Sequence, residues 1–418
     1  MGYTIAEKVL ARVSGATAVR AGDEVQAKPD FVILYDYPGI TDVLFRQMKQ
    51  EFGVEQLAEP ERYAVFIDHM TPPKLPKEEA FHIETRNWCK HHGVALYERR
   101  GIGHQVCTEV GYAVPGAFVT HFDGHVSQLG AFGTLAIGIR RNILEAFVRQ
   151  TVSIKVPATT KIVLDGTLRN GVMARDVFHQ IVGQLGPMSC RFQVMELAGD
   201  GLRGISLDGR QAICGLAMFT GAVTAVVSPD EETLRHAIPR ARVKLDPVIS
   251  DADANYAAVH HIDLAAIEPI IVIPPNPSNT RLLREFVGTP IDVGYIGSCV
   301  SGRLEDLRAA AQVLKGRRIK EGFSLNVVPS SQDVMAEAAA EGLITTLVQA
   351  GAFISSSSCD FCFGHIATMS AGQRAVSTGT LNIPGRMGSP ESEIYICNAA
   401  AVAAAALEGR VVDPRDYL

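Results

Sequence analysis

Three cysteines in the last third of the chain have side chains and a spacing that could hold a metal centre. Cys359 and Cys362 form a C-x-x-C pair in SSSSCDFCFGH, and Cys299 stands sixty positions before Cys359 in GSCVSGRLEDLR. A C-x-x-C turn presents two sulfurs to one metal centre, and a distant loop can supply the third. Three thiolates on a cubane iron–sulfur cluster would leave one iron without a protein ligand, able to act as a Lewis acid.

The same cysteines are compatible with other chemistry. Together with His365 they could form a Cys₃His set for structural zinc. A redox dithiol at the C-x-x-C pair is disfavoured, because no thioredoxin-like sequence surrounds it. The spacing alone therefore leaves zinc and an iron–sulfur cluster open as alternatives. The remaining cysteines have apolar neighbours or no cysteine nearby, which is typical of small buried residues: Cys89, Cys107, Cys190, Cys214 and Cys397.

The elements around Cys299 would place it at a turn between a strand and a helix. The run IDVGYIGS, residues 291–298, predicts a short buried strand. LEDLRAAAQVL, residues 304–314, has helical spacing and good helix formers, with two acidic residues in its first turn. Cys299 would then lie near the positive end of a helix dipole, which favours a thiolate.

Strands and helices alternate through most of the sequence, which predicts the α/β class. FVILYD, YAVFID, HGVALYE and AFVTHF, residues 31–36, 63–68, 92–98 and 117–122, predict strands separated by helical stretches. KIVLDGTL at residue 161 and IDVGYIG at residue 291 begin two further units of the same kind. We therefore expect three α/β domains, comprising residues 1–145, 146–280 and 281–418.

Composition excludes several classes of function. The 418 residues are 47% hydrophobic and 20% charged, with a formal net charge of −6. That charge and the absence of a basic stripe argue against a nucleic-acid partner. No apolar run approaches the roughly 20 residues that cross a bilayer, so we expect no membrane partner. Because no export signal is present, we expect a reducing, cytoplasmic location.

Several segments resemble the aconitase superfamily. GSCVSGRLEDLR is similar to the family's G-S-C-T-N-G-R-x-E-D-L-R, and FIDHM, IGHQV and HFDGHVSQLGAFGTLAIGI follow in the family's order. The opening TIAEKVLARVSG and the closing NIPGRMGSPESEIYICNAA and VDPRDYL are similar too. The match is collinear over nearly the whole chain. The nearest group is the separate large subunit of the isopropylmalate isomerase and homoaconitase type, of which this would be a divergent member.

The resemblance implies three α/β domains around a [4Fe–4S] cluster held by Cys299, Cys359 and Cys362. It implies stereospecific dehydration and hydration of a 2-hydroxy di- or tricarboxylic acid, with the open iron taking the substrate hydroxyl. In this group a small subunit carries the swivelling domain and its Ser base. We therefore expect that small subunit as a partner, a carboxylic acid as substrate, and a hydro-lyase or isomerase activity that needs both subunits.

The resemblance also assigns the acid side of the site. It pairs Asp68 with His69, and Asp123 with His104, and it adds His125. Pairing with a carboxylate raises the pKa of an imidazole and fixes its tautomer, which suits protonation of a departing hydroxide. The resemblance matches position 124 and the segment 379–386 to residues that contact the substrate in the family. It does the same for Arg303, the arginine of GSCVSGRLEDLR. The substrate-binding positions would be Gly124, Arg303, Leu381 and Arg386.

Several of these positions depart from the family pattern. Gly124 stands where the family has a Ser, Leu381 where it has an Arg, and Met218 where it has the Glu that supports the histidine matched by His125. Leu381 cannot make a bidentate carboxylate contact. Near the cysteines, Ser301 replaces an Asn, and Asp360-Phe361 replaces Gly-Pro.

These departures indicate a changed substrate. An unpaired carboxylate against Leu381 would cost several kcal/mol, so we expect one carboxylate fewer, or an apolar group in its place. Maleate-, citraconate- and dimethylmalate-type acids are candidates, ahead of isopropylmalate. The alternative is a non-catalytic paralogue that keeps zinc or an iron–sulfur cluster only as a scaffold.

Overall fold

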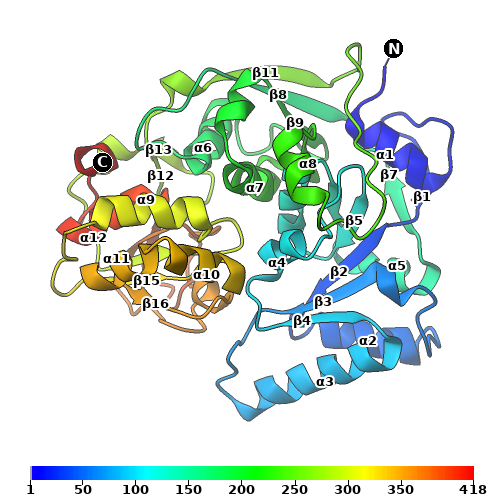
Figure 1. Cartoon of the computed structure of the whole chain (residues 1–418), viewed down its shortest axis with the longest axis horizontal. Coiled ribbons are helices and arrows are strands. Elements are labelled where there is room, and N and C mark those ends of the chain that lie inside the picture. Colours follow the sequence, from blue (N-terminus) through cyan, green and yellow to red (C-terminus); the bar gives the residue numbers. More distant parts are fainter. Residues whose placement is uncertain (1) are drawn as a thin grey trace.

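Three larger β-sheets with helices on their faces, and one two-stranded sheet, organise the described part of the chain (Figure 1). The computed structural model describes residues 2–418. Strands and helices alternate as the hydrophobic runs predict, and the α/β class is confirmed. The opening segment forms the helix α1, Ile5–Ser14, which begins with a capping box between Thr4 and Glu7. None of the helices in this described part of the chain is both long enough and apolar enough to cross a membrane.

The first sheet is fully parallel, with the strand order β4-β3-β2-β5-β6. Its central strands are buried along their whole length, as expected for a parallel sheet covered on both faces. The strands are β2 (Phe31–Tyr35), β3 (Tyr63–Ile67), β4 (Ala95–Glu98), β5 (Phe118–His121) and β6 (Leu135–Gly138). The helices are α2 (Thr41–Gln50), α3 (Pro76–His92), α4 (Gly103–Glu109) and α5 (Ile143–Arg149), with the 3₁₀ segment η2 (Gly124–Phe132) after β5.

The second sheet is also parallel, in the order β10-β9-β8-β11, and it shares a hydrophobic core with the first. The shared core joins η2 to α7, so the segment that carries His125 is clamped between two layers. The strands are β8 (Thr159–Asp165), β9 (Val194–Ala198), β10 (Thr224–Val227) and β11 (Ala258–Asp263). The helices are α6 (Ala174–Leu185), α7 (Leu207–Leu216) and α8 (Glu231–Ala237).

The third sheet has seven strands in the order β13-β12-β18-β17-β14-β15-β16 and a core of its own. The Ala-rich α12 packs against α9 within this core, where small side chains allow close approach. The strands are β12 (Ile270–Val272), β13 (Thr280–Leu282), β14 (Val293–Ile296), β15 (Ser324–Val327), β16 (Phe353–Ile354), β17 (Arg374–Ser377) and β18 (Glu393–Ile396). The helices are α9 (Leu304–Leu314), α10 (Gln332–Ala340), α11 (Leu343–Ala350) and α12 (Ala399–Glu408).

Strand pairing extends across both expected domain boundaries. The strand β7, Val152–Lys155, pairs antiparallel with β1, Glu24–Ala27, so the first layer continues past residue 145. The strands β12 and β13 pair with each other, and β12 pairs with β18, so the third sheet begins before residue 280. The limits 1–145, 146–280 and 281–418 stay a prediction, because sheet membership alone does not define an independently folding unit.

Candidate active site

The predicted acid residues follow parallel strands of the first sheet at their carboxyl ends. Asp68 and His69 come after β3, while Asp123 comes after β5 and caps η2 by accepting the backbone N–H of His125 at 2.9 Å. His104 lies in the first turn of α4. β3 and β5 are parallel strands of one sheet, separated by β2, so their carboxyl ends lie at one edge, which is where open α/β sheets bind ligands. The sheet therefore gathers side chains that are far apart in sequence.

The cysteine loops of the third layer reach this same edge. Cys299 lies between β14 and α9, as predicted, and Cys359 and Cys362 follow β16. The backbone N–H of Cys359 donates to the carbonyl of Asp68 at 2.9 Å. Arg303 braces the other cysteine loop by donating to the carbonyl of Cys299 at 2.9 Å and to the Gln105 and Gln128 side chains, each at 2.8 Å. The predicted cysteines and the predicted acid are thus brought together.

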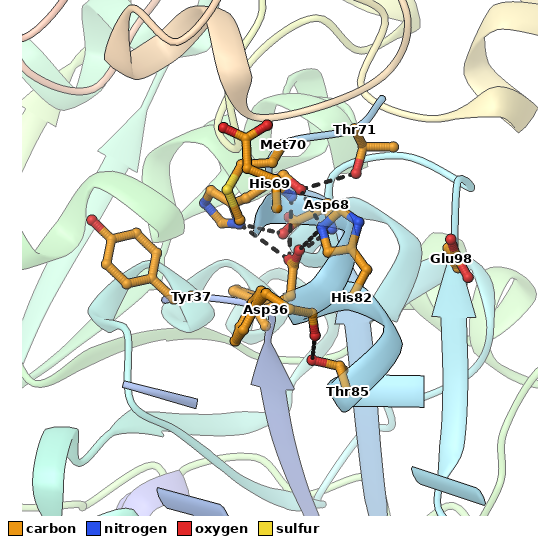
Figure 2. A network of polar contacts seen from close by, with 12 residues as sticks. Asp36, Tyr37, Asp68, His69, Met70, Thr71, His82, Thr85 and Glu98 are labelled. Carbon is orange, nitrogen blue, oxygen red and sulfur yellow. Dashed lines mark hydrogen bonds and ion pairs between the residues drawn. The ribbon is translucent and has the colours of Figure 1, made fainter. Parts of the chain in front are cut away.

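His69 lies between two buried carboxylates (Figure 2). Its Nδ1 is 2.7 Å from Asp68 Oδ1 and 3.4 Å from Asp36 Oδ1. Asp36 also accepts the backbone N–H groups of Asp68 at 2.9 Å and of His69 at 3.2 Å. His82 closes the network, because its Nε2 lies 3.1 Å from Asp36 Oδ2 and 3.2 Å from the carbonyl oxygen of His69.

This arrangement gives His69 the properties that a general acid needs. Burial by itself lowers the pKa of His69, but Asp68 and then Asp36 outweigh burial and raise that pKa well above its usual value. Both carboxylates occupy Nδ1, which leaves Nε2 to act on a ligand. The side chain is 12% exposed, whereas those of Asp68 and Asp36 are 1% and 0% exposed. A protonated His69 can therefore present an N–H to the open side of the site.

The second predicted pair behaves differently: Asp123 raises the pKa of His104 as expected, but burial has the larger effect. His104 Nε2 is 3.7 Å from Asp123 Oδ2, too far for a good hydrogen bond. Burial lowers the pKa of His104 well below its usual value, and Asp123 offsets only part of that effect. Burial raises the pKa of Asp123, but His125 and then His104 outweigh burial and bring that pKa below its usual value. The carboxyl therefore stays ionised. His104 is consequently a neutral imidazole beside an anion.

His125 has a backbone partner where the family has a Glu. Its Nδ1 lies 2.7 Å from the carbonyl oxygen of Gly215, so Nδ1 carries the hydrogen and Nε2 is an acceptor. Met218 lies beside Gly124, since a Cβ added at position 124 would be 3.3 Å from Met218 Sδ. Gly124 and Met218, two of the departures from the family pattern, are therefore adjacent to each other, next to His125. They make this part of the site less polar, because they stand in place of a Ser and a Glu.

The spacing of the cysteines argues against one zinc ion. A tetrahedral zinc holds thiolates at about 2.3 Å, and hence about 3.8 Å from one another. Among the residues that the structure describes, the only set of three candidate ligand atoms within 4.8 Å of one another comes from Asp36, Asp68 and His69. His365 Nε2 lies 3.5 Å from a carboxylate oxygen of Glu78, so this imidazole nitrogen faces a carboxylate and not the cysteines. A cluster binds each sulfur to a different iron and so does not require the three sulfurs to surround a single point.

Buried hydroxyls near the cysteines also fit a cluster. In the described part of the chain their oxygens are buried and lack a hydrogen-bond partner: Ser301, Ser357, Ser358 and Tyr295. Ser357 and Ser358 directly precede Cys359, and the Tyr295 ring stacks on that of Phe361 at 6.1 Å. Such hydroxyls can donate to thiolate or sulfide sulfur, so the residues present suit the proposed group.

The predicted substrate residues differ in how many of their polar atoms already have hydrogen-bond partners, and Arg303 and Arg386 contact the cysteines. Arg386 Nη2 donates to Cys362 Sγ at 3.1 Å, and its Nε has no partner among the described residues. Arg303 is 1% exposed, and although three of its hydrogen bonds are internal, its Nη1 lacks a partner in residues 2–418. Leu381 is half-buried in the loop that also carries Arg386. Their roles toward a substrate stay predictions.

Sequence reasoning missed Asp36 and His82. Asp36 had a usable signal, because it follows the buried run FVILY just as Asp68 follows YAVFI, and the two strands are parallel neighbours. His82 had no such signal, because a single histidine in the middle of α3 does not indicate which part of the protein that face of the helix contacts. Its role depends entirely on how α3 packs over the end of the first sheet (Figure 2).

Comparison with known proteins agrees with this architecture. A profile of the Aconitase family (aconitate hydratase) matches residues 17–290 and 284–409. The chain is 36% identical over 422 residues to the 3-isopropylmalate dehydratase large subunit 1 of Methanopyrus kandleri, with 100% of both chains covered. It is 35% identical to the 3-isopropylmalate dehydratase large subunit of Aquifex aeolicus, over 100% of this chain and 98% of that one. The large subunit of the Moorella thermoacetica 3-isopropylmalate dehydratase is 36% identical over 100% of both. Sequence, fold and site thus agree, and the chain belongs to the aconitase family.

Proposed function

We propose that this chain is the large subunit of a hydro-lyase that acts on a small 2-hydroxy acid. One observation carries the proposal: the loop of the buried acid pair Asp68–His69 is hydrogen-bonded to the loop of the C-x-x-C pair, through the backbone N–H of Cys359. A scaffold that only bound metal would have no need of a partly exposed imidazolium beside it. The relatives named as 3-isopropylmalate dehydratase large subunits support the reaction class.

The chain's own residues can perform the acid half of the reaction. A [4Fe–4S] cluster bound by Cys299, Cys359 and Cys362 would supply Lewis-acid chemistry toward a substrate hydroxyl. His69 would give its Nε2 proton to the departing hydroxyl, so that water leaves. Asp68 and Asp36 stabilise the imidazolium beforehand, because both lie against Nδ1. Arg386 and Arg303 would bind a substrate carboxylate, and in support each keeps one guanidinium nitrogen without a hydrogen-bond partner among the described residues.

The base that removes the Cα proton is assigned to a small subunit, by resemblance to the family. The test is the assembly of both chains after anaerobic reconstitution with iron and sulfide, assayed with citraconate and dimethylmaleate through the loss of double-bond absorbance. We expect turnover with both chains and only background with the large subunit alone. Full cluster content without turnover of any 2-hydroxy or unsaturated acid in the assembly would instead favour the non-catalytic scaffold. A cytoplasmic location also stays a prediction.

Substrate choice should follow the departures at Gly124 and Leu381. The double change Gly124→Ser with Leu381→Arg adds a hydroxyl and a guanidinium, and a charge-assisted contact is worth about 10- to 100-fold in kcat/KM. We expect the ratio of kcat/KM for homocitrate over that for 2,3-dimethylmalate to rise by that factor. Met218 must move slightly to admit the serine, since its Sδ would lie 3.3 Å from the new Cβ.

The matched control is Leu381→Met, which conserves volume and adds no charge. It should leave the ranking of the two acids unchanged. If the double variant ranks a panel of malate-type acids as the parent does, positions 124 and 381 do not select the substrate, whatever the reaction class.

A further inference from the structure

Asp360 is a fully buried carboxylate that lies in the C-x-x-C segment and binds the loop of the catalytic acid. Its Oδ1 accepts the backbone N–H of Met70 at 2.6 Å, and its Oδ2 accepts that of Thr71 at 2.9 Å. The side chain is 0% exposed. The two partners directly follow His69 in sequence and are about three hundred positions from Asp360 along the chain. A departure that the sequence left unexplained thus makes a specific long-range contact.

The backbone at Met70 is shaped to receive a carboxylate. Met70 has a φ of +51°, a left-handed conformation that is uncommon for a residue with a side chain. A left-handed residue within a turn can direct consecutive N–H groups toward one point, and such a nest binds anions. A carboxylate suits it because each oxygen can accept one N–H, whereas an amide offers only one oxygen. Asp360 is therefore the anion that this nest holds.

Other contacts tie the same two loops together around this point. The N–H of Cys359 donates to the carbonyl of Asp68 at 2.9 Å, and Lys74 Nζ donates to the carbonyl of His365 at 2.5 Å. The rings of His69 and Phe363 are 5.7 Å apart. Asp360 supplies two bonds at the centre of this clasp, immediately beside the backbone of His69. No other described contact of the clasp fixes two successive backbone groups at once.

We propose that Asp360 is a positioning residue, which holds the acid His69 in a fixed place relative to the cysteine loop. The proposal rests on the proposed function, because it gives His69 the role of general acid. The loops of the first and third sheets then cannot shift against each other at the site without breaking the hydrogen bonds from Met70 and Thr71 to Asp360. The cysteine loop and His69 then keep a constant relative position during the reaction. This matters because a displacement of about 1 Å at a reacting group can lower the rate about 10²-fold.

The test compares Asp360→Asn with Asp176→Asn. Asp176 is a matched control, because it too is 0% exposed and accepts two backbone N–H groups, from Met173 at 2.8 Å and Ile270 at 2.9 Å, neither of which belongs to the loops of the proposed cluster cysteines. Amide hydrogen exchange by mass spectrometry on the full chain reports the peptide that contains Met70 and Thr71. We expect exchange in that peptide to rise at least about tenfold in Asp360→Asn and to stay unchanged in Asp176→Asn.

Kinetics of the two-subunit assembly with citraconate give the second readout. We expect kcat to fall about 10- to 100-fold in Asp360→Asn while KM changes less than about threefold, since the acid and not substrate binding is displaced. Asp360→Gly empties the nest, and added formate, a small carboxylate, should restore part of kcat with saturation. The same formate should have no effect on the parent or on Asp176→Asn.

The outcomes separate this inference from the proposed function. Unchanged amide exchange in Asp360→Asn overturns the inference, whether or not the parent assembly has activity. Increased exchange with kcat within about twofold of the parent also overturns it, because the clasp would then be irrelevant to the acid. If the parent assembly shows no turnover, the proposed function is wrong and the role given to Asp360 falls with it. Should Asp360→Asn be insoluble, Asp360→Gly with and without formate provides both readouts.

Discussion

The Cys359→Ala protein should contain no [4Fe–4S] cluster and, assembled with its small subunit, should have no measurable turnover. A cluster held by three thiolates loses a third of its protein ligands with this change, and Asp360 beside it offers no replacement because its oxygens are engaged by Met70 and Thr71. Iron and sulfide analysis after anaerobic reconstitution measures the first effect, together with the visible absorbance of the cluster. The hydration assay measures the second.

Cys89→Ala is the control for this experiment. Cys89 is also buried, at 2% exposure, but it lies in α3, outside both the Cys299 loop and the C-x-x-C segment. That variant should keep its full complement of iron, sulfide and activity. One equivalent of zinc and no sulfide in the parent protein would contradict the cluster assignment and revive the structural zinc site. Full cluster content in Cys359→Ala would contradict the assigned ligand.

His69→Gln should lower kcat about 10²- to 10⁴-fold, the range over which a general acid contributes. Glutamine can keep a hydrogen bond toward Asp68 but cannot carry a proton to the leaving hydroxyl. Cluster content should stay at the level of the parent, which separates loss of the acid from loss of the cofactor. His91→Gln is the control, since His91 is exposed, its ring nitrogen contacts the carbonyl of Glu55, and its ring lies against that of His92. A kcat within threefold of the parent in His69→Gln would exclude His69 as the acid.

The pH dependence of kcat should report the same acid. Burial lowers the pKa of His69, but Asp68 and then Asp36 raise it well above its usual value, so the acid form is present at neutral pH. Activity that needs this form is full at lower pH and is lost as the pH rises through the raised pKa. Asp68→Asn removes the carboxylate 2.7 Å from Nδ1, so the basic limb of the profile should move to lower pH. A limb that stays in place in this variant would mean that another group limits the rate.

Local patterns in the sequence were sufficient for most of the elements, whereas the resemblance to the family supplied most of the candidate residues. The run LEDLRAAAQVL forms α9, and the small residues before it form the turn that holds Cys299. The strands that precede Asp68 and Asp123 were visible as buried hydrophobic runs. Such predictions succeed because the periodicity of apolar side chains and the capping residues act within about one turn or one strand.

The electrostatic state of these residues was decided by tertiary structure. The sequence pairs His104 with Asp123 as it pairs His69 with Asp68, yet the pKa of His104 falls while that of His69 rises. The difference is one of distance and burial: 3.7 Å in the first pair and 2.7 Å in the second. A pKa depends on the loss of solvent and on charges within a few ångström, and neither is encoded in neighbouring residues.

Contacts between distant segments were likewise beyond the sequence. His82 faces Asp36 only because α3 packs over the end of the first sheet, and Asp360 reaches Met70 and Thr71 only because the first and third layers meet there. Among the described residues, the cysteines and His365 form no set of three ligand atoms within 4.8 Å of one another, and this too depends on how separate loops are placed. The sequence by itself determined which groups the chain has and on which elements they lie. The tertiary structure decided which of them share a site and in what charge state, because burial and long-range approach arise only when the layers pack together.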